Sequence, residues 1–383
     1  MLLSKKIFIT SSSILLITLL FWGIYIFSFK KPSPEKEAVV SKKSDDAQVE
    51  KTSIVGNEER IQKITDESVI SPILSDNDES MKYYSKSSGK VYQLDLLTLE
   101  KKVVSDANLI GLLDVYWSPN QGMVISKFSS GAGYPKFSFF DYLTKKASRL
   151  NESIGAVSWQ SNKKIIYTYF DNKNKEKSIN ISDPNGENWN KITTFSSDSI
   201  SIAPVPKSGF ISFWNKPDSF SETLFQSTPI MGGETKVLSS GVFGADYLWN
   251  SDGTMFLRSN VDQKGGHKME LGFANSLGGE YKNIGLPTFV SKCVWSKNNS
   301  FVFCALPGSI SEKNILPNDY LDSSFTTNDT FWKVNLKTGE KTRVVPLEEL
   351  KTTYDATGLF LSYNESYLFF VNKIDDKLYR IRL

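Results

Sequence analysis

Residue types that carry out hydrolytic or metal chemistry are scarce in this sequence. Its 383 residues include one histidine and two cysteines, so a centre built from several histidines is impossible, although carboxylate and thiolate chemistry stays open. The histidine, His267, stands in the segment 263–268, which we expect to be an exposed loop. A serine hydrolase needs a serine elbow and a histidine base, and Gly131-Ala132-Gly133 lacks that serine. The sequence therefore indicates no catalytic residue, no metal ligand and no cofactor.

Two clusters of acidic and amide side chains raise the question of calcium binding. They are Asp76-Asn77-Asp78-Glu79 and Asp171-Asn172-Lys173-Asn174. Calcium takes roughly six to eight oxygen ligands, and an EF-hand loop adds an internal glycine and a terminal glutamate. The segment 171–176 lacks this arrangement. We therefore expect both clusters to be solvated turns.

The two cysteines, Cys293 and Cys304, are placed to meet across a turn. They stand before and after Lys297-Asn298-Asn299-Ser300, on the two strands of an expected hairpin. Pairing around this turn would bring them nearly opposite, which allows a cross-strand disulfide if the domain is exported. A register change of one residue would separate them as two buried thiols. The sequence leaves both outcomes open.

The charge balance argues against nucleic acid as a partner. There are 45 lysine and arginine residues against 42 acidic residues, which gives a formal net charge of +3. This near balance provides no basic field for DNA or RNA. The hydrophobic content of 40% is enough for a sizeable core. The chain is therefore expected to fold and to bind something other than nucleic acid.

Residues 7–29 form an uncharged stretch with lysines on both sides. A helix of this length would reach about 34 Å, enough to cross the hydrocarbon layer of a membrane. Trp22 and Tyr25 near its far end suit the membrane interface. No small-residue cleavage site follows the stretch. We therefore expect residues 1–29 to be a retained single-pass transmembrane anchor rather than a cleaved signal peptide.

The orientation of this anchor depends on its flanks. Lysines after the stretch outnumber those before it, which opposes export by the positive-inside rule. The short N-terminal flank with two lysines, however, is typical of an uncleaved export signal. We expect a cell-membrane protein with an extracytoplasmic C-terminal domain. Residues 30–57, which are charged and contain Ser and Pro, are expected to be a flexible linker.

The remaining chain is a repeat. A strand end, a polar turn and a second apolar strand recur, most clearly around Trp117, Trp159, Trp249 and Trp295. Seven copies begin at positions 74, 117, 159, 204, 249, 295 and 361, with spacings of 43, 42, 45, 45, 46 and 66 residues. A second, glycine-containing turn follows in many copies, as at Gly232-Gly233 and Gly278-Gly279. Two hairpins, and hence four antiparallel strands, per copy of about 45 residues indicate the blade of a β-propeller.

The two ends of this repeat region complement each other. The last copy stops at residue 383 where its fourth strand should begin, and residues 58–65 resemble the start of such a strand. We therefore predict an all-β fold over residues 58–383, a seven-bladed β-propeller closed by an N-terminal strand. The fixed place of the tryptophans in each copy favours packing between blades over sugar stacking.

This Trp-Ser-Pro-Asn-like hairpin with a later Gly-Glu turn resembles the repeats of TolB-type propellers and of the propeller in prolyl-oligopeptidase and dipeptidyl-peptidase-IV-like (WD40-like) proteins. The resemblance covers residues 58–383 as a repeat pattern. It implies a fold rather than an activity. We expect neither the α/β domain that precedes the TolB propeller nor a hydrolase domain after residue 383, so neither family's activity is carried over.

The 66-residue spacing marks the position most suggestive of binding. It contains an insertion at residues 308–328, and the following connection at 346–354 leaves the same blade on the same face. Long loops on a rigid scaffold often carry binding, although loops also tolerate insertions without a ligand. Loops of other blades should meet on this rim. The candidate rim residues are Tyr134, Trp214, Tyr320, Phe325 and Tyr354.

These features support a first hypothesis, a membrane-anchored, non-catalytic propeller that binds a protein, a peptide or an envelope polymer. The second hypothesis is a hydrolase or lyase that uses carboxylates and tyrosines at the central channel. Convergent carboxylates at the channel mouth would favour the second. An accessory subunit of a membrane complex is a third hypothesis.

Overall fold

The computed structural model describes residues 59–131 and 134–383. Their secondary structure is almost entirely strand, interrupted by a one-turn helix, α2 (Asn318–Leu321), and two short 3₁₀ helices, η1 (Val290–Lys292) and η2 (Leu347–Glu349). The apolar stretch 7–29 and the linker lie outside the described residues. Within residues 59–131 and 134–383, no helix has the length and apolar character needed to cross a membrane.

Antiparallel hairpins build every sheet in chain order. The first three four-stranded sheets contain β2 (Val69–Leu74), β3 (Ser80–Ser85), β4 (Val91–Asp95) and β5 (Lys101–Ser105); β6 (Leu112–Trp117), β7 (Met123–Phe128), β8 (Lys136–Asp141) and β9 (Ala147–Arg149); and β10 (Ile154–Ser161), β11 (Lys164–Asp171), β12 (Glu176–Ser182) and β13 (Asn190–Thr194).

A seven-stranded sheet follows, because one long strand serves two units. It contains β14 (Ile200–Pro204), β15 (Phe210–Asn215), β16 (Glu222–Pro229), β17 (Lys236–Trp249), β18 (Met255–Val261), β19 (Met269–Asn275) and β20 (Lys282–Asn283). The first part of β17 pairs with β16, and the part from Phe243 onward pairs with β18. Strand β17 is therefore the last strand of one four-stranded unit and the first strand of the next.

The last two sheets complete the described chain. They contain β21 (Cys293–Trp295), β22 (Phe301–Pro307), β23 (Asp329–Asn335) and β24 (Lys341–Arg343); and β25 (Ala356–Leu361), β26 (Tyr367–Asn372), β27 (Lys377–Arg382) and β1 (Ile61–Lys63). Strand β1 pairs with β27, with Ile61 opposite Ile381. The two ends of the described chain thus share one sheet.

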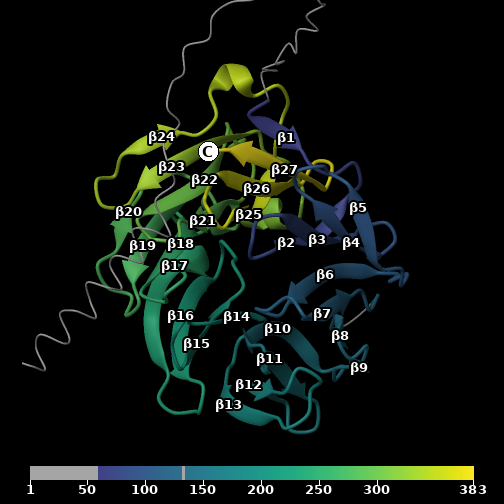
Figure 1. Ribbon diagram of the computed structural model, residues 1–383. Helices are drawn as coiled ribbons and strands as arrows, with labels where there is room; N and C mark the ends of the chain where they lie inside the picture. Colours follow the sequence, from purple (N-terminus) through teal and green to yellow (C-terminus); the bar gives the residue numbers. More distant parts are fainter. Residues whose placement is uncertain (1–58, 132–133) are drawn as a thin grey trace, which may run out of the picture. The chain divides into compact units, whose positions relative to one another are not determined.

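The sheets follow one another around a ring (Figure 1). Apolar side chains fill the space between neighbouring sheets; for example, Ile125 of β7 and Phe139 of β8 share a cluster with Ile154 and Ile165 of the next sheet. Burial of both faces of each sheet explains why the strands carry long apolar runs instead of strict alternation.

The repeated tryptophans connect neighbouring sheets. The indole N–H of Trp159 donates to the carbonyl of Tyr116, and that of Trp117 donates to the carbonyl of Ser71, each at 2.8 Å and each in the preceding sheet. The indole N–H of Trp249 donates to Ser212 Oγ at 2.9 Å, in the preceding unit of the seven-stranded sheet. Because each of these indoles bonds to the preceding four-stranded unit, the tryptophans join neighbouring units, as their repeat position predicts.

The two ends of the ring differ. We call the end with the connections between the first and second strands of each unit the turn end, and the opposite end the loop end. At the turn end, connections of neighbouring units bond to each other: Asn120 N–H donates to Asn162 Oδ1 at 2.9 Å, Asn299 Nδ2 to Asp252 Oδ2 at 2.9 Å, and Asn364 N–H to Asp78 Oδ2 at 2.9 Å.

The cysteines face each other in this fold. Cys293 of β21 is opposite Cys304 of β22, and the two are joined by a disulfide. Both side chains are buried among apolar residues. The sequence left open a disulfide or two separate thiols, and the register of this hairpin gives the disulfide.

Candidate functional site

A cavity of about 440 Å³ opens at the loop end, between the sheet of β6–β9, the sheet of β10–β13 and the start of β14. We call it the lysine pocket. The residues that define its chemistry are Lys127, Tyr134, Thr168, Lys177, Asp198 and Lys216.

The lysines of this pocket stand at strand ends that the ring brings together. Lys127 is near the end of β7, where it pairs with Phe137 of β8. Lys177 is near the start of β12, and Lys216 directly follows β15. In a four-stranded unit the second strand ends, and the third begins, at the loop end. Three distant segments therefore deliver their ammonium groups to one end of the molecule.

The lysines differ in their partners. Lys177 Nζ lies 2.8 Å from Asp198 Oδ1 and also donates to the carbonyls of Ser196 and Ser197. The hydrogen bond from Lys177 lowers the pKa of Asp198. Lys127 and Lys216, by contrast, have no acceptor among the residues that the structure describes. Three ammonium groups and one carboxylate leave two positive charges unpaired in the pocket.

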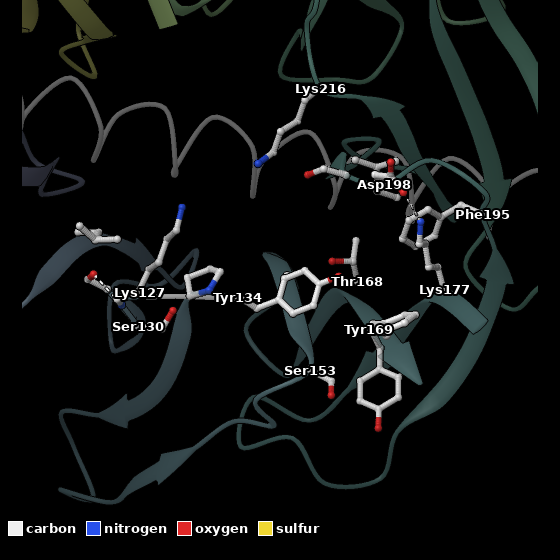
Figure 2. A pocket seen from close by; sticks show the side chains of 18 residues that line it. Lys127, Ser130, Tyr134, Ser153, Thr168, Tyr169, Lys177, Phe195, Asp198 and Lys216 are labelled. Atoms are coloured by element: carbon white, nitrogen blue, oxygen red, sulfur yellow. Dashed lines mark hydrogen bonds and ion pairs between the residues drawn. The ribbon is translucent and has the colours of Figure 1, made fainter. Parts of the chain in front are cut away.

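Figure 2 shows the side chains of Lys127 and Lys216 extending into the same space from opposite sides. An aromatic and hydroxylic wall lies beside them. The Tyr134 ring is 43% exposed, and the Thr168 hydroxyl accepts a hydrogen bond from the Ala156 amide at 2.9 Å. A Cβ atom at Gly155 would lie 3.4 Å from the Tyr134 ring and 3.0 Å from Thr168 Oγ1. The absence of a side chain at Gly155 therefore leaves room for the Tyr134 ring and the Thr168 hydroxyl.

No family model matches the chain, and no curated protein matches its sequence. Solved structures match its fold. An oligogalacturonate lyase in complex with manganese has a TM-score of 0.61 at 14% identity, over 84% of this chain and 93% of that one. The oligogalacturonate lyase of Vibrio parahaemolyticus has a TM-score of 0.59 at 10% identity, over 84% and 93%.

The β-propeller domain of the trilobed protease from Pyrococcus furiosus has a TM-score of 0.51 at 12% identity, over 82% of this chain and 95% of that one. The fold is a β-propeller. This likeness confirms the propeller fold that the repeat resemblance predicted. That domain has an open velcro topology, whereas β1 and β27 pair in this propeller.

The aromatic residues predicted for the rim of the propeller occupy different environments. Tyr134 lines the lysine pocket. Trp214 is buried, with its indole N–H bonded to Asp246 Oδ1 at 2.9 Å. Tyr354 is buried against Phe331 and Phe370. The rings of Trp214 and Tyr354 therefore belong to the core and not to an exposed rim.

The insertion at 308–328 folds down onto the propeller. Tyr320 of α2 is buried and stacks on Phe289 with ring centroids 4.4 Å apart. Phe325 is half-buried beside Tyr320. Since apolar residues of β18 and β19 share this cluster, the insertion covers a part of the core. The Tyr320 ring is therefore part of the core and not of an exposed rim, whereas Phe325 keeps part of its surface exposed.

A buried ionic cluster lies beneath this insertion. Lys292 Nζ of η1 contacts Asp329 Oδ2 and Asp355 Oδ1 at 2.6 Å each, and all three side chains are fully buried. Tyr320 donates its hydroxyl to Asp355 Oδ1 at 2.7 Å. We call these four residues the Lys292 cluster. Sequence analysis missed it, because its members are far apart in the chain and none stands in a recognisable motif.

Burial of the Lys292 cluster affects the pKa values of its two carboxyl groups. Burial raises the pKa of Asp329, whose Oδ1 has no hydrogen-bond partner. Burial also opposes ionisation of Asp355, but the Lys292 ammonium and its hydrogen bonds hold the pKa of that carboxyl below its usual value. Two carboxylates and a tyrosine converge here, whereas the enzyme hypothesis places such groups at the mouth of the central channel. None of them is accessible to a substrate.

The lysine pocket gathers side chains that can bind anions. Ammonium groups and hydroxyls bind carboxylate or phosphate oxygens. His267 is exposed, bonds the carbonyl of Asn314 at 2.8 Å, and is not among the residues that line this pocket. In residues 59–131 and 134–383, no three His, Cys, Asp or Glu side chains gather as a metal site.

Proposed function

We propose that the protein is a membrane-attached, non-catalytic propeller that binds an envelope polymer with repeated anionic groups at the lysine pocket. The observation that carries this proposal is the pair Lys127 and Lys216. Their ammonium groups share one cavity and have no acceptor among the described residues. A carboxylate or a phosphate of the polymer would supply the missing acceptor.

The shape of the pocket supports a polymer over a small ion. Its volume of about 440 Å³ exceeds what one carboxylate needs. The exposed Tyr134 ring and the half-buried Tyr169 ring offer flat surfaces against which sugar rings pack. Seryl and threonyl hydroxyls along the wall suit a polyhydroxylic chain.

The scaffold of this proposal is a ring of seven blades closed by β1. The six sheets resolve into seven four-stranded units when β17 is divided between its two partners. The β1–β27 ladder would join the ends of the chain and remove an exposed sheet edge. A closed ring would hold loops from three blades at fixed distances around the pocket.

The proposal also includes attachment of the chain to a membrane and export of the propeller domain. The uncharged stretch 7–29 has the length of a membrane span. The Cys293–Cys304 disulfide supports an oxidising compartment for the propeller, since such bonds persist outside the cytoplasm. An envelope polymer would be accessible to the domain in that compartment.

The test is a titration of the purified full chain with polygalacturonate, with polyphosphate and with neutral dextran, at constant ionic strength. The first two polymers separate carboxylate from phosphate recognition. We expect the Lys127→Gln/Lys216→Gln double variant to lose about tenfold or more in affinity for the preferred polyanion, which corresponds to about 1.4 kcal/mol.

A matched control removes the same charge elsewhere. Lys236→Gln/Lys282→Gln changes two exposed lysines outside the pocket and should bind as the unchanged chain does. Equal losses in both double variants would indicate a general charge effect and contradict the proposal. Equal affinity for dextran and for the polyanions would contradict it as well.

A further inference from the structure

Five large apolar side chains project from equivalent connections of the propeller. They occupy the connections between the third and fourth strands of successive units: β4–β5, β8–β9, β12–β13, β16–β17 and β19–β20. All five are exposed. They are Leu97 at 91%, Leu143 at 90%, Trp189 at 59%, Met231 at 92% and Leu277 at 76%. We call them the apolar tips.

The local structure does not require an apolar residue at these positions. Asp95 Oδ1 accepts the amides of Leu97 and Thr98 at 2.9 and 2.8 Å, and Asn275 Oδ1 accepts the amide of Leu277 at 3.0 Å. These backbone contacts fix the turn while the leucine side chain points outward. A polar residue would fit the same turn, so these exposed apolar side chains are not needed to form it.

All five tips lie at the turn end. Four of these connections bond to the first turn of their own unit, as when Leu96 N–H donates to Glu79 O at 2.9 Å and Ser276 N–H to Thr254 O at 2.8 Å. The fifth, β12–β13, joins the third and fourth strands at the same end of its unit. The first turns of three pairs of neighbouring units also bond to each other. The tips therefore face one side of the propeller, opposite the lysine pocket.

The chain enters the propeller at this same end. Arg382 N–H donates to Arg60 O at 3.0 Å, and Leu383 N–H donates to Ser366 O at 2.9 Å, in the first turn of the last unit. Arg60, which directly precedes β1, therefore lies at the turn end. The linker and the uncharged stretch 7–29 of the proposed attachment precede this point in the sequence.

We infer that the apolar tips insert into the interfacial layer of the membrane to which the chain is attached. The inference rests on the proposed attachment and not on the ligand of the pocket. Apolar and tryptophan side chains enter this layer to a depth of about 5–10 Å. The exposed Lys146, in the same connection as Leu143, suits anionic headgroups. The docked propeller would hold the lysine pocket away from the bilayer.

The experiment places a fluorophore on one tip of the full chain in vesicles. The native cysteines are joined to each other, so Leu143→Cys or Leu277→Cys provides a single thiol for labelling. The vesicles contain phosphatidylcholine and a nitroxide-labelled phospholipid as quencher. Ile110→Cys is the matched control, because Ile110 is also an exposed aliphatic residue (85%) but lies in the β5–β6 connection at the loop end.

We expect about threefold stronger quenching of the labels at positions 143 and 277 than of the label at 110. Equal quenching at all three positions would overturn the inference. Shielding of the tip labels from aqueous iodide without quenching by the nitroxide lipid would assign the tips to a protein contact and would overturn it too.

Flotation of the same vesicles distinguishes attachment of the chain to the membrane from docking of the apolar tips. If the chain floats with the vesicles but its tips are not quenched, attachment stands and docking is wrong. If the chain does not float, the attachment is wrong and docking fails with it. Binding of polyanions to the lysine pocket is measured separately and does not depend on either result.

Discussion

The ammonium group of Lys292 lies 2.6 Å from a carboxylate oxygen of Asp355, and neither side chain is exposed. The same ammonium group contacts Asp329 and the carbonyl of Ala356. These contacts join η1, the start of β23 and the segment before β25. The pair therefore links two neighbouring units of the propeller beneath the insertion.

Removing the cation of this cluster should destabilise the fold strongly. Lys292→Met leaves two buried carboxyl groups without their counterion, and we expect a loss of about 3–5 kcal/mol in the free energy of unfolding. Urea denaturation measures it. Lys351→Met breaks an exposed pair with Glu59 and should lose less than about 1 kcal/mol. Similar small losses in both variants would contradict a structural role for Lys292.

The stability contributed by Asp355 should depend on pH. The pKa of this carboxyl is lowered in the folded chain, so its contribution is present above the unfolded value of about 3.9 and is lost as the pH falls through the folded value. The difference in unfolding free energy between the unchanged chain and Asp355→Asn should therefore be largest above about pH 5 and narrow below about pH 4. A difference that widens on acidification would contradict this assignment.

Much of the fold follows from local pattern. The tryptophan positions, the turn residues between them and the spacing of about 45 residues determine hairpins, and hairpins in series build a propeller. Two outcomes could be predicted for the cysteines, a disulfide or two separate thiols, because a short turn allows few strand registers. The prediction of a strand within residues 58–65 also came from local sequence, and Ile61–Lys63 of this segment pair with β27.

The candidate site could not be predicted in the same way. Lys127, Lys177 and Lys216 come from three units of the propeller, and only ring geometry brings them together. How the insertion at 308–328 packs also depends on residues that are distant in the sequence. A long segment with aromatic residues suggests a binding loop, yet Tyr320 buries its ring against Phe289, and Phe325 packs beside Tyr320.

Two glycines in equivalent turns should respond differently to alanine. Both have positive φ, +82° at Gly278 and +75° at Gly339, but a Cβ at Gly278 would lie 1.8 Å from the Leu238 carbonyl oxygen, whereas nothing lies within 4 Å at Gly339. Gly339→Ala should lose about 1 kcal/mol from backbone strain alone. Gly278→Ala should lose at least about twice that in thermal or urea unfolding. Equal losses would argue against the close approach at Gly278.

The disulfide should be present in oxidised protein and should stabilise the fold. We expect no alkylation of Cys293 or Cys304 without reductant, and two alkylated thiols after denaturation and reduction, as measured by intact mass. The double variant Cys293→Ala/Cys304→Ala closes no loop and should unfold with about 3 kcal/mol less free energy. Alkylation of the unreduced chain would contradict the bond.

Covalent labelling of lysines tests the proposed binding site most directly. The full chain would be acetylated briefly with and without the preferred polyanion, and modification at each lysine would be measured by mass spectrometry. Binding at the lysine pocket predicts strong protection of Lys127 and Lys216, with Lys236 and Lys282 modified as before. Unchanged labelling of Lys127 and Lys216 in the presence of saturating polyanion, or protection spread evenly over surface lysines, would contradict it.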